Sequence, residues 1–162
     1  MMCRAYARAP QGARAYSTRP AKRGGNLTIL SALSLQGIVA SISMTIHGAA
    51  DGQVFLAYIT EVLIPQLHPG QVVVMDNLNT HKIVGIRQAI EAVGARLLYL
   101  PEYSPELNPI EECWSKVKSI LRTIGARTYE ALEQAVAQAL AAVNATDAFG
   151  WFTHAGYCMQ SG

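Results

Sequence analysis

The chain of 162 residues is long enough for one domain with a sizeable hydrophobic core. Its apolar fraction of 51% excludes an intrinsically disordered protein, and no apolar run reaches the roughly 18 residues of a membrane-spanning helix. The three cysteines, Cys3, Cys113 and Cys158, have the spacing of neither a metal site nor a disulfide framework, so we expect a reducing cytosol.

The net charge of +2 is unevenly distributed along the chain. Residues 1–25 contain six of the 13 basic residues and none of the 11 acidic ones, so this basic N-terminal arm carries +6. The seven basic and eleven acidic residues that remain give −4. Such an arm is typical of a protein that binds a polyanion such as nucleic acid, although a solvated tail fits the composition equally well. The candidate DNA contacts in the arm are Arg4, Arg8, Arg14, Arg19, Lys22 and Arg23.

The arm also shares an Arg- and Ala-rich, acid-free composition with mitochondrial transit peptides. A single serine, together with the helix breakers Pro10, Gly12 and Gly24-Gly25, disfavours that interpretation.

Residues 26–48 predict an antiparallel hairpin with its turn at Gln36-Gly37. Between Ile38 and Ile46, apolar side chains alternate with more polar ones, which indicates one buried and one wetter face. Asp51 is then expected to cap a helix, which Pro65 and the Pro69-Gly70 pair end. The apolar residues of this helix are Phe55, Tyr58, Val62 and Leu63.

The alternation of apolar and polar residues stops in VVVMDNLNTH, residues 72–81, which begins with four consecutive apolar residues. The continuous apolar run predicts a strand buried on both faces of a parallel sheet. A helix from about Thr80 to Val93, with Asn79 and Thr80 as candidate caps and Gly94 at its end, follows this strand. A second strand in residues 95–100 completes a right-handed strand–helix–strand unit.

Asp76 stands at the carboxyl end of the first of these strands, where ligands bind in parallel sheets. It is therefore a candidate site residue, although starting a turn is an alternative role. Asn77 and His81 follow closely and are candidates for contact with DNA or a metal-bound water. A lone histidine in this position also commonly has a structural role.

The stretch PEYSPELNPIEECWSKVK, residues 101–118, predicts two turns and then a helix with Asn108 at its N-cap. Glu111 is the third helical residue, where it can form half of a capping box instead of binding a ligand. Tyr103 and Ser104 are candidates for phosphate contact, with loop packing as the simpler interpretation. We assign Trp114 and Trp151 to core packing, and His47, His68 and His154 have no partners at ligand spacing.

These motifs carry a resemblance. VVVMDNLNTHK, LLYLPEYSPELNPIEECWSKVK and the closing WFTHAGY resemble the catalytic domain of bacterial insertion-sequence transposases of the mariner superfamily, with the 630-type branch nearest. The family has a ribonuclease-H-like fold and places 34 residues between its second Asp and its final Glu. Residues 77–110, between Asp76 and Glu111, also number 34.

The resemblance implies that Asp76 and Glu111 are the second and third carboxylates of a DDE triad that binds Mg²⁺ or Mn²⁺. Two such ions, about 4 Å apart, activate the attacking oxygen and stabilise the leaving one, and magnesium prefers the hard oxygens of carboxylates. The implied activity is cleavage and transfer of DNA strands at transposon ends, in a bacterial, nucleoid-associated, cytoplasmic protein. Implied partners are double-stranded DNA at the terminal inverted repeats and target, and a second copy in a homodimer.

The chain departs from the family at the first triad aspartate. No acidic residue precedes Asp51, and Asp51 matches the position that starts a helix after the family's hairpin. We therefore expect an α/β, ribonuclease-H-like domain in residues 26–162 without its first strand, and an isolated chain without activity. The upstream half of the transposase is then a further possible partner. We expect the basic arm to fill the place of the missing strand, or else the strand at Val72–Met75 to have an unpaired edge.

Two alternatives remain open. The chain is a catalytically dead remnant that binds DNA or protein, or it is another nuclease on the same fold, since a fold alone does not assign a function.

Overall fold

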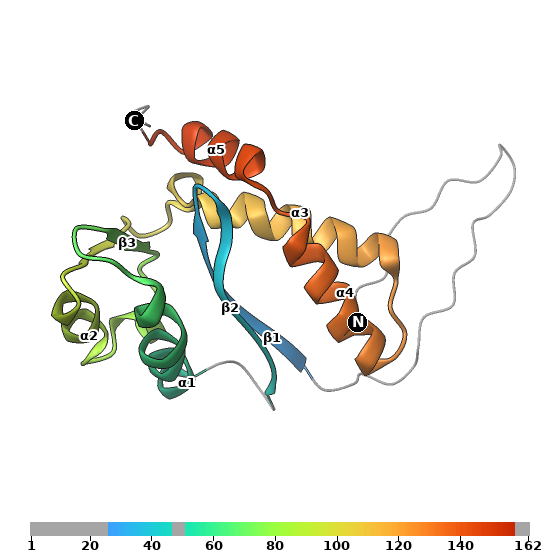
Figure 1. Cartoon of the computed structure of the whole chain (residues 1–162), viewed down its shortest axis with the longest axis horizontal. Helices are drawn as coiled ribbons and strands as arrows, with labels where there is room; N and C mark the ends of the chain where they lie inside the picture. The colour runs from blue at the N-terminus through green and yellow to red at the C-terminus, as the bar shows by residue number, and fades with distance from the viewer. Residues whose placement is uncertain (1–25, 47–50, 158–162) are drawn as a thin grey trace, which may run out of the picture.

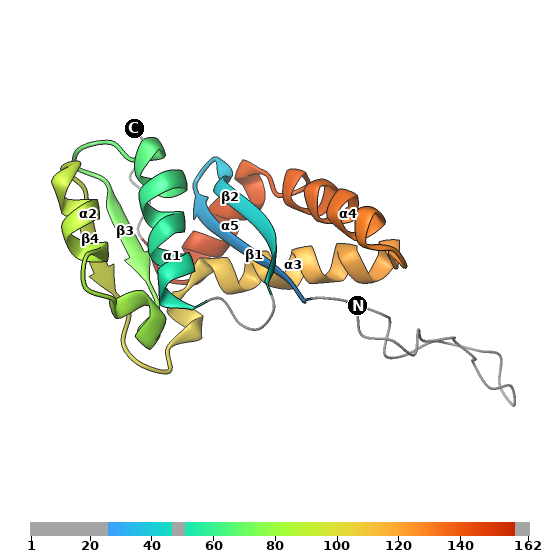
Figure 2. The same cartoon turned by 90° about the horizontal axis from the view of Figure 1, so that it is seen from below.

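The computed structural model describes residues 26–46 and 51–157 and shows an α/β protein (Figure 1). A β-hairpin lies between a unit with two parallel strands and a group of three helices (Figure 1; Figure 2). The basic arm, His47, Cys3 and Cys158 lie outside the described residues. The strands are β1 (Asn26–Ser34), β2 (Gly37–Ile46), β3 (Val72–Met75) and β4 (Arg96–Tyr99), and the α-helices are α1 (Gly52–Tyr58), α2 (Ile86–Ala92), α3 (Pro109–Ile124), α4 (Tyr129–Ala141) and α5 (Ala145–His154).

β1 and β2 form the predicted antiparallel hairpin, but the turn is at Leu35-Gln36, one residue earlier than predicted. Gly37 begins β2 with φ at +117°, and a Cβ there would lie 3.0 Å from the carbonyl oxygen of Val143. This glycine is therefore required by the close approach of the chain after α4. A register shift between Leu30 and Ala32 leaves the residue between them unpaired, as in a β-bulge.

Asp51 caps α1 as predicted, because its side chain accepts a hydrogen bond of 3.0 Å from the backbone N–H of Val54. The helical chain continues through a π-helical turn, Ile59–Leu63, into a 3₁₀ turn, Ile64–Gln66. Pro65 lies in that last turn and cannot donate a backbone hydrogen bond, so the helix ends there. The buried residues of this segment are Phe55, Tyr58, Ile59 and Leu63.

β3 and β4 pair in parallel over four residues, as the sequence predicts. They are less buried than predicted, because Met75 and Leu97 are buried whereas Val72 and Leu98 are about half exposed. Within the described residues β3 is hydrogen-bonded to β4 alone. The sequence predicts a free edge along this strand as one of two outcomes, and the described part of the chain has one.

The helix after β3 is shorter than predicted. A 3₁₀ turn, Asn79–Lys82, comes first, and α2 begins only after Gly85, whose φ of +109° is incompatible with a continuous helix. Asn79 and Thr80 therefore do not cap α2, and this prediction was wrong. Gly94 ends the segment as predicted, with φ at +78°.

The C-terminal part of the molecule is helical, and the first of its helices, α3, follows Asn108 as predicted. α3 begins at Pro109 and ends at Gly125, whose left-handed conformation lets its N–H bond the carbonyl of Leu121. α5 begins with a capping box between Asn144 and Asp147. No helix in residues 26–46 and 51–157 is long and apolar enough to cross a membrane.

The buried side chains form two clusters, one on each side of the hairpin. The strand-side core joins the α1 segment to β3, α2 and β4, and the helix-side core joins α3 to α4. β1 contributes to both, because successive side chains of a strand point to opposite faces. Leu30 and Ala32 pack against the strand-side core, and Leu27, Ile29 and Leu33 pack against the helix-side core. Trp114 and Trp151 pack against the helix-side core, as predicted.

Candidate active site

Asp76 is the first residue after β3, so the strand places its carboxylate where the sheet ends. Its Oδ1 accepts a hydrogen bond of 3.2 Å from the backbone N–H of Leu78, which fixes the side chain over its own turn. No other described residue bonds its second oxygen, Oδ2. The turn role and the ligand role are therefore compatible, since one oxygen serves each.

His81 also contacts this carboxylate. Its Nδ1 lies 2.6 Å from Asp76 Oδ1, within ion-pairing distance, although the two atoms do not have the alignment of a hydrogen bond. The imidazole ring stacks on Phe55 of α1, with centroids 4.1 Å apart, and Tyr99 donates a hydrogen bond of 2.6 Å to the carbonyl of His81. These contacts hold the histidine in place, so it orients Asp76.

Glu111 lies in the first turn of α3, at the third helical position. The alternative role of half a capping box is not realised: the Asn108 side chain makes no cap hydrogen bond, and its backbone N–H bonds the carbonyl of Pro105. The Glu111 carboxylate has no hydrogen-bond or ion-pair partner within the described residues. It is available to a ligand.

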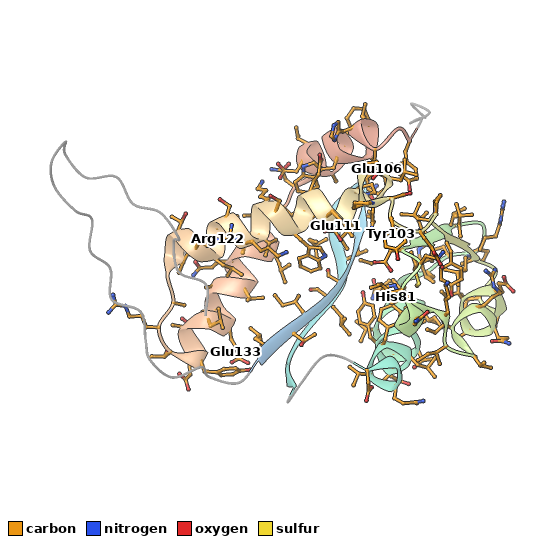
Figure 3. All side chains as sticks on the ribbon, turned by 180° about the vertical axis from the view of Figure 1, so that it is seen from behind. His81, Tyr103, Glu106, Glu111, Arg122 and Glu133 are labelled. Atoms are coloured by element: carbon orange, nitrogen blue, oxygen red, sulfur yellow. The ribbon has the colours of Figure 1, made fainter. Side chains whose placement is uncertain are left out.

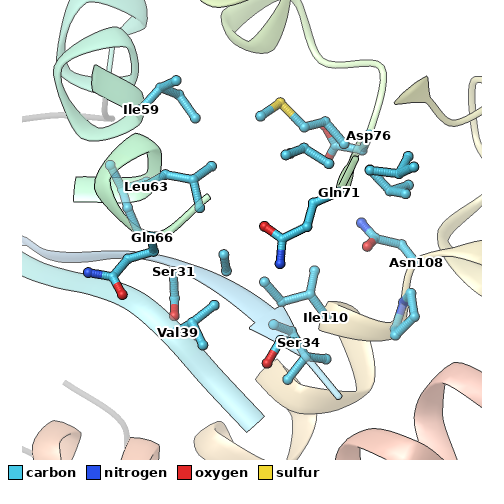
Figure 4. Close-up of a pocket in the computed structure, with 18 of the residues that line it drawn as sticks. Ser31, Ser34, Val39, Ile59, Leu63, Gln66, Gln71, Asp76, Asn108 and Ile110 are labelled. Atoms are coloured by element: carbon cyan, nitrogen blue, oxygen red, sulfur yellow. The ribbon is translucent and has the colours of Figure 1, made fainter. Parts of the chain in front are cut away.

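Two cavities meet at these carboxylates. The larger, which we call the interstrand cleft, has a volume of about 800 Å³ and lies between β1 and β3 (Figure 4). The smaller, which we call the loop pocket, has about 390 Å³ and is formed by the chain after β3 and after β4. Asp76, Asn108 and Glu111 line both cavities. The structure thus brings together the two carboxylates that the sequence analysis selected.

The predicted neighbours of Asp76 divide between the two cavities. His81 lines the interstrand cleft and Asn77 lines the loop pocket, so both remain close to the carboxylates. The sequence predicts no partner for His154. In the structure its Nδ1 is 2.6 Å from Glu112 Oε1, and this contact links α5 to α3. The basic residues of the arm lie outside the described residues.

Tyr103 is the residue whose position the sequence analysis missed. Instead of packing in its loop, it is 97% exposed at the loop pocket, and its φ of +58° is rarely adopted by a bulky side chain (Figure 3). Tyr103 and Glu111 both line the loop pocket. The signal available in the sequence was an aromatic residue in a turn bounded by two prolines, where packing partners are scarce.

Two further tyrosines line the interstrand cleft as neutral groups. Burial raises the pKa of the Tyr58 hydroxyl far above its ordinary value, and it also raises the pKa of Tyr157, whose hydroxyl donates a hydrogen bond of 2.9 Å to the Leu107 carbonyl. Both phenols therefore stay protonated at physiological pH and add no charge to the cleft.

The carboxylates suit a divalent cation only in part. Asp76 and Glu111 offer hard oxygens, and Asp76 Oδ2 and the Glu111 carboxylate have no partner among the described side chains. Residues 26–46 and 51–157 contain no group of three or more His, Cys, Asp or Glu side chains that could hold a metal ion. Two carboxylates alone would leave the coordination of a pair of ions incomplete.

Residues 1–134 match the sequence profile of the DDE superfamily endonucleases. The chain belongs to the DDE endonuclease superfamily. The matched residues include both Asp76 and Glu111. No curated protein sequence is significantly similar to this DDE endonuclease chain.

Solved structures of a mariner transposase share the fold of this DDE endonuclease chain. The Mos1 transposase paired-end complex with left transposon end superposes with a TM-score of 0.73 and 13% identity, over 93% of this chain and 46% of that chain. The Mos1 strand transfer complex has a TM-score of 0.66 and 14% identity, over 94% of this chain and 46% of that chain. The pre-cleavage Mos1 transpososome has a TM-score of 0.67 and 12% identity, over 98% of this chain and 52% of that chain. These matches confirm the predicted ribonuclease-H-like α/β class. The chain spans about half the length of the transposase chains that it matches.

Proposed function

We propose that the chain is the part of a transposase catalytic domain, of the 630-type insertion-sequence branch, that supplies the second and third carboxylates for DNA cleavage and strand transfer at transposon ends. The observation that carries this proposal is that Asp76 and Glu111, with 34 residues between them in the sequence, line the same two cavities. The similar Mos1 structures, which are a transposon-end complex and a strand transfer complex, support it.

Each residue has a defined part in this proposal. Asp76 presents Oδ2 from the end of β3 while His81 and the Leu78 N–H hold Oδ1, and Glu111 presents its carboxylate from the start of α3. Mg²⁺ or Mn²⁺ bound there would activate the attacking water or 3′ hydroxyl and stabilise the leaving oxygen. A structure of the Mos1 mariner paired-end complex with Mn supports the choice of metal. The DNA would run over the loop pocket, past Asn77 and Tyr103.

We further propose that residues 1–162 alone do not cleave DNA. Asp51, the first acidic residue, caps α1 and lines neither cavity, so it is not placed to serve as the remaining carboxylate. The upstream half of the transposase is the expected source of that group, and a homodimer is the expected assembly on a pair of transposon ends.

The metal site is tested by titrating the chain with Mn²⁺ and following free Mn²⁺ by electron paramagnetic resonance. We expect weak binding that is at least tenfold weaker in Asp76→Asn and in Glu111→Gln. The matched control is Glu106→Gln, because Glu106 is exposed, lies in the loop just before α3 and lines neither cavity (Figure 3). Equal Mn²⁺ affinity in all four proteins would contradict the assignment.

A second candidate is the catalytically dead DNA-binding remnant, which is favoured because the described residues place no third carboxylate at the site. The two candidates separate when an upstream segment that contains a strand ending in aspartate is added. Mg²⁺-dependent nicking of an inverted-repeat duplex by the completed protein, lost in Asp76→Asn, supports the transposase. DNA binding without nicking by the completed protein supports the remnant.

A further inference from the structure

Asn108 shares with the two carboxylates the place where the cavities meet. Within the described residues, three line both the interstrand cleft and the loop pocket: Asp76, Asn108 and Glu111. The two carboxylates have roles in the proposed function, and the amide is the remaining group. Figure 4 shows the Asn108 side chain pointing into the interstrand cleft.

The position of Asn108 in the chain offers its side chain a different role, which it does not perform. Asn108 is the N-cap of α3, where an asparagine commonly accepts a hydrogen bond from one of the first backbone N–H groups of the helix. Its side chain makes no such bond. The N–H of Glu111 donates instead to the Asn108 backbone carbonyl, at 3.0 Å, so the amide oxygen is not used there.

The backbone of Asn108 differs from that of the N-caps whose side chains do bond. Asp51, Thr128 and Asn144 have ψ angles of 175°, 166° and 175°. The ψ angle of Asn108 is 95°, and its N–H is bonded to the carbonyl of Pro105 at 3.0 Å. Because ψ sets where the following N–H groups lie relative to the side chain, this conformation accounts for an amide that does not reach them.

The same conformation leaves Asn108 and Glu111 free together. In a capping box the N-cap and the third helical residue lie side by side, because each side chain bonds the other's backbone N–H. At the start of α3 both of these N–H groups are bonded to backbone carbonyls instead. The two neighbouring side chains therefore have no hydrogen-bond partner within the described residues, and both line the cavities that Asp76 lines.

An amide oxygen supplies part of what the two carboxylates lack. Mg²⁺ and Mn²⁺ prefer carboxylate, carbonyl and water oxygens in an octahedral arrangement, so two carboxylates leave positions open. The side-chain carbonyl of an asparagine is a ligand of this kind. Because it is neutral, it would leave more of the charge of the ion available to stabilise a leaving oxygen.

We propose that Asn108 is a further protein ligand of the divalent cation, with its Oδ1 bound to the ion that Asp76 and Glu111 hold. The inference rests on the proposed function and extends it to a residue outside the carboxylate triad. The cation would then be bound by one carboxylate from the end of β3, and by an amide and a carboxylate from the start of α3.

The test measures the affinity of the full chain for Mn²⁺ alone, by electron paramagnetic resonance of the free ion. Asn108→Leu keeps the approximate size of the side chain and removes its polar atoms, whereas Asn108→Asp keeps the shape and replaces the amide by a carboxylate. We expect Asn108→Leu to bind Mn²⁺ about threefold more weakly and Asn108→Asp about tenfold more tightly, because affinity rises with the charge of the ligands. A purely structural role would not give opposite changes in two variants of similar shape.

Leu107→Asp is the matched control for the added charge. Leu107 precedes Asn108, is 37% exposed, is not among the residues of either core and lines neither cavity. The variant brings the same carboxylate to the adjacent position, where it attracts the ion only through solvent. We expect its Mn²⁺ affinity to stay within about twofold of the parent in 0.15 M salt.

Urea unfolding checks that the variants fold, and Asn108→Leu should keep the midpoint of the parent because no cap hydrogen bond is lost. If this variant is destabilised, Asn108→Asp, which retains a preferred N-cap residue, carries the comparison with Leu107→Asp on its own.

Three outcomes would overturn the inference. Unchanged Mn²⁺ affinity in both Asn108 variants, with weaker binding in Asp76→Asn and Glu111→Gln, would overturn the inference alone, and an amide that donates to a DNA phosphate would give this result. Equal gains in Asn108→Asp and Leu107→Asp would also overturn it, since charge alone would explain them. Unchanged affinity in Asp76→Asn and Glu111→Gln would overturn the proposed metal site as well.

Discussion

Glu111 lies in the first turn of α3 but does not form the capping box that is common for a glutamate at this position. Since its carboxylate caps nothing, Glu111→Gln should change the free energy of unfolding only through the helix dipole, by about 0.3–1 kcal/mol. In a protein completed with an upstream aspartate strand, the same change should abolish strand cleavage. Urea unfolding and a nicking assay on one preparation measure both effects.

Glu106→Gln is the appropriate control for this pair of measurements. Glu112, the neighbouring glutamate on α3, is less suitable, because it lies 2.6 Å from His154 and its replacement removes a contact between α3 and α5. Cleavage retained by the Glu111 variant would remove Glu111 from the site and leave Asp76 without its partner carboxylate.

Tyr103 has nearly all of its surface in solvent, so its contribution to folding is small. Tyr103→Ala should leave the free energy of unfolding within about 0.5 kcal/mol of the parent. If the ring stacks on a base near the carboxylates, the same change should weaken DNA binding by about 1–3 kcal/mol. Anisotropy with a labelled inverted-repeat duplex measures the loss. Val84→Ala is the control, because Val84 is 87% exposed and lines neither cavity; equal affinity in the two variants would exclude Tyr103 from the DNA path.

At the scale of the element, α5 is attached through the carboxylate of Asp147. A hydrogen bond from the Lys116 ammonium and another from the Asn144 backbone N–H lower the pKa of Asp147 in the folded state. The carboxylate therefore stabilises the fold above its unfolded pKa of about 3.9, and this contribution is lost as the pH falls through the lower folded value. Asp147→Ala should lower the unfolding free energy by about 1 kcal/mol at pH 7.

The difference in unfolding free energy between parent and Asp147→Ala should narrow as the pH falls below about 3.9, since the carboxyl is then protonated first in the unfolded state and, at lower pH, also in the folded state. Urea unfolding at pH 7 and at the lowest pH that keeps the parent folded compares them. Glu130→Ala, in the first turn of α4, is the matched control, because Glu130 is exposed and makes no hydrogen bond or ion pair with described residues. A constant difference across the pH range would contradict this account.

The elements that were predicted well are those whose signal is local. The cap at Asp51, the strand at Val72–Met75 and the start of α3 at Pro109 follow from short-range chemistry that tertiary contacts do not override. The helix predicted over 80–93 failed because Gly85 adopts a positive φ, and no pattern of apolar residues reports a backbone dihedral.

The same limit applies to the candidate site. The spacing of Asp76 and Glu111 could be read from the sequence, because it rests on a motif. The sequence could not show that Glu111 leaves α3 uncapped, because this depends on a hydrogen bond from the Asn108 N–H to the carbonyl of Pro105. The contact between Glu112 and His154 joins residues 42 positions apart, and only the packing of α5 on α3 brings them together.

At the scale of the whole molecule, the charge asymmetry determines how DNA binding should respond to salt. The arm carries +6 on a body of −4, so we expect the arm to bind the DNA phosphates. Replacing Arg14, Arg19 and Arg23 by glutamine should reduce the slope of log K against log salt by about 0.9 for each phosphate that the variant no longer neutralises. Anisotropy with duplex DNA at a series of salt concentrations measures the slope. An unchanged slope would show that the arm does not bind phosphate.

The two hydrophobic cores share no buried residue, and the hairpin is packed between them. Asp76 follows β3, which belongs to the strand-side core, whereas Glu111 lies on α3, whose buried face belongs to the helix-side core. The distance between the carboxylates is thus set by how the two cores pack on the two faces of the hairpin, not by a single element. A cation held by both carboxylates would link the two cores across the hairpin. With a cation bound at both carboxylates, we therefore expect the two cores to unfold together.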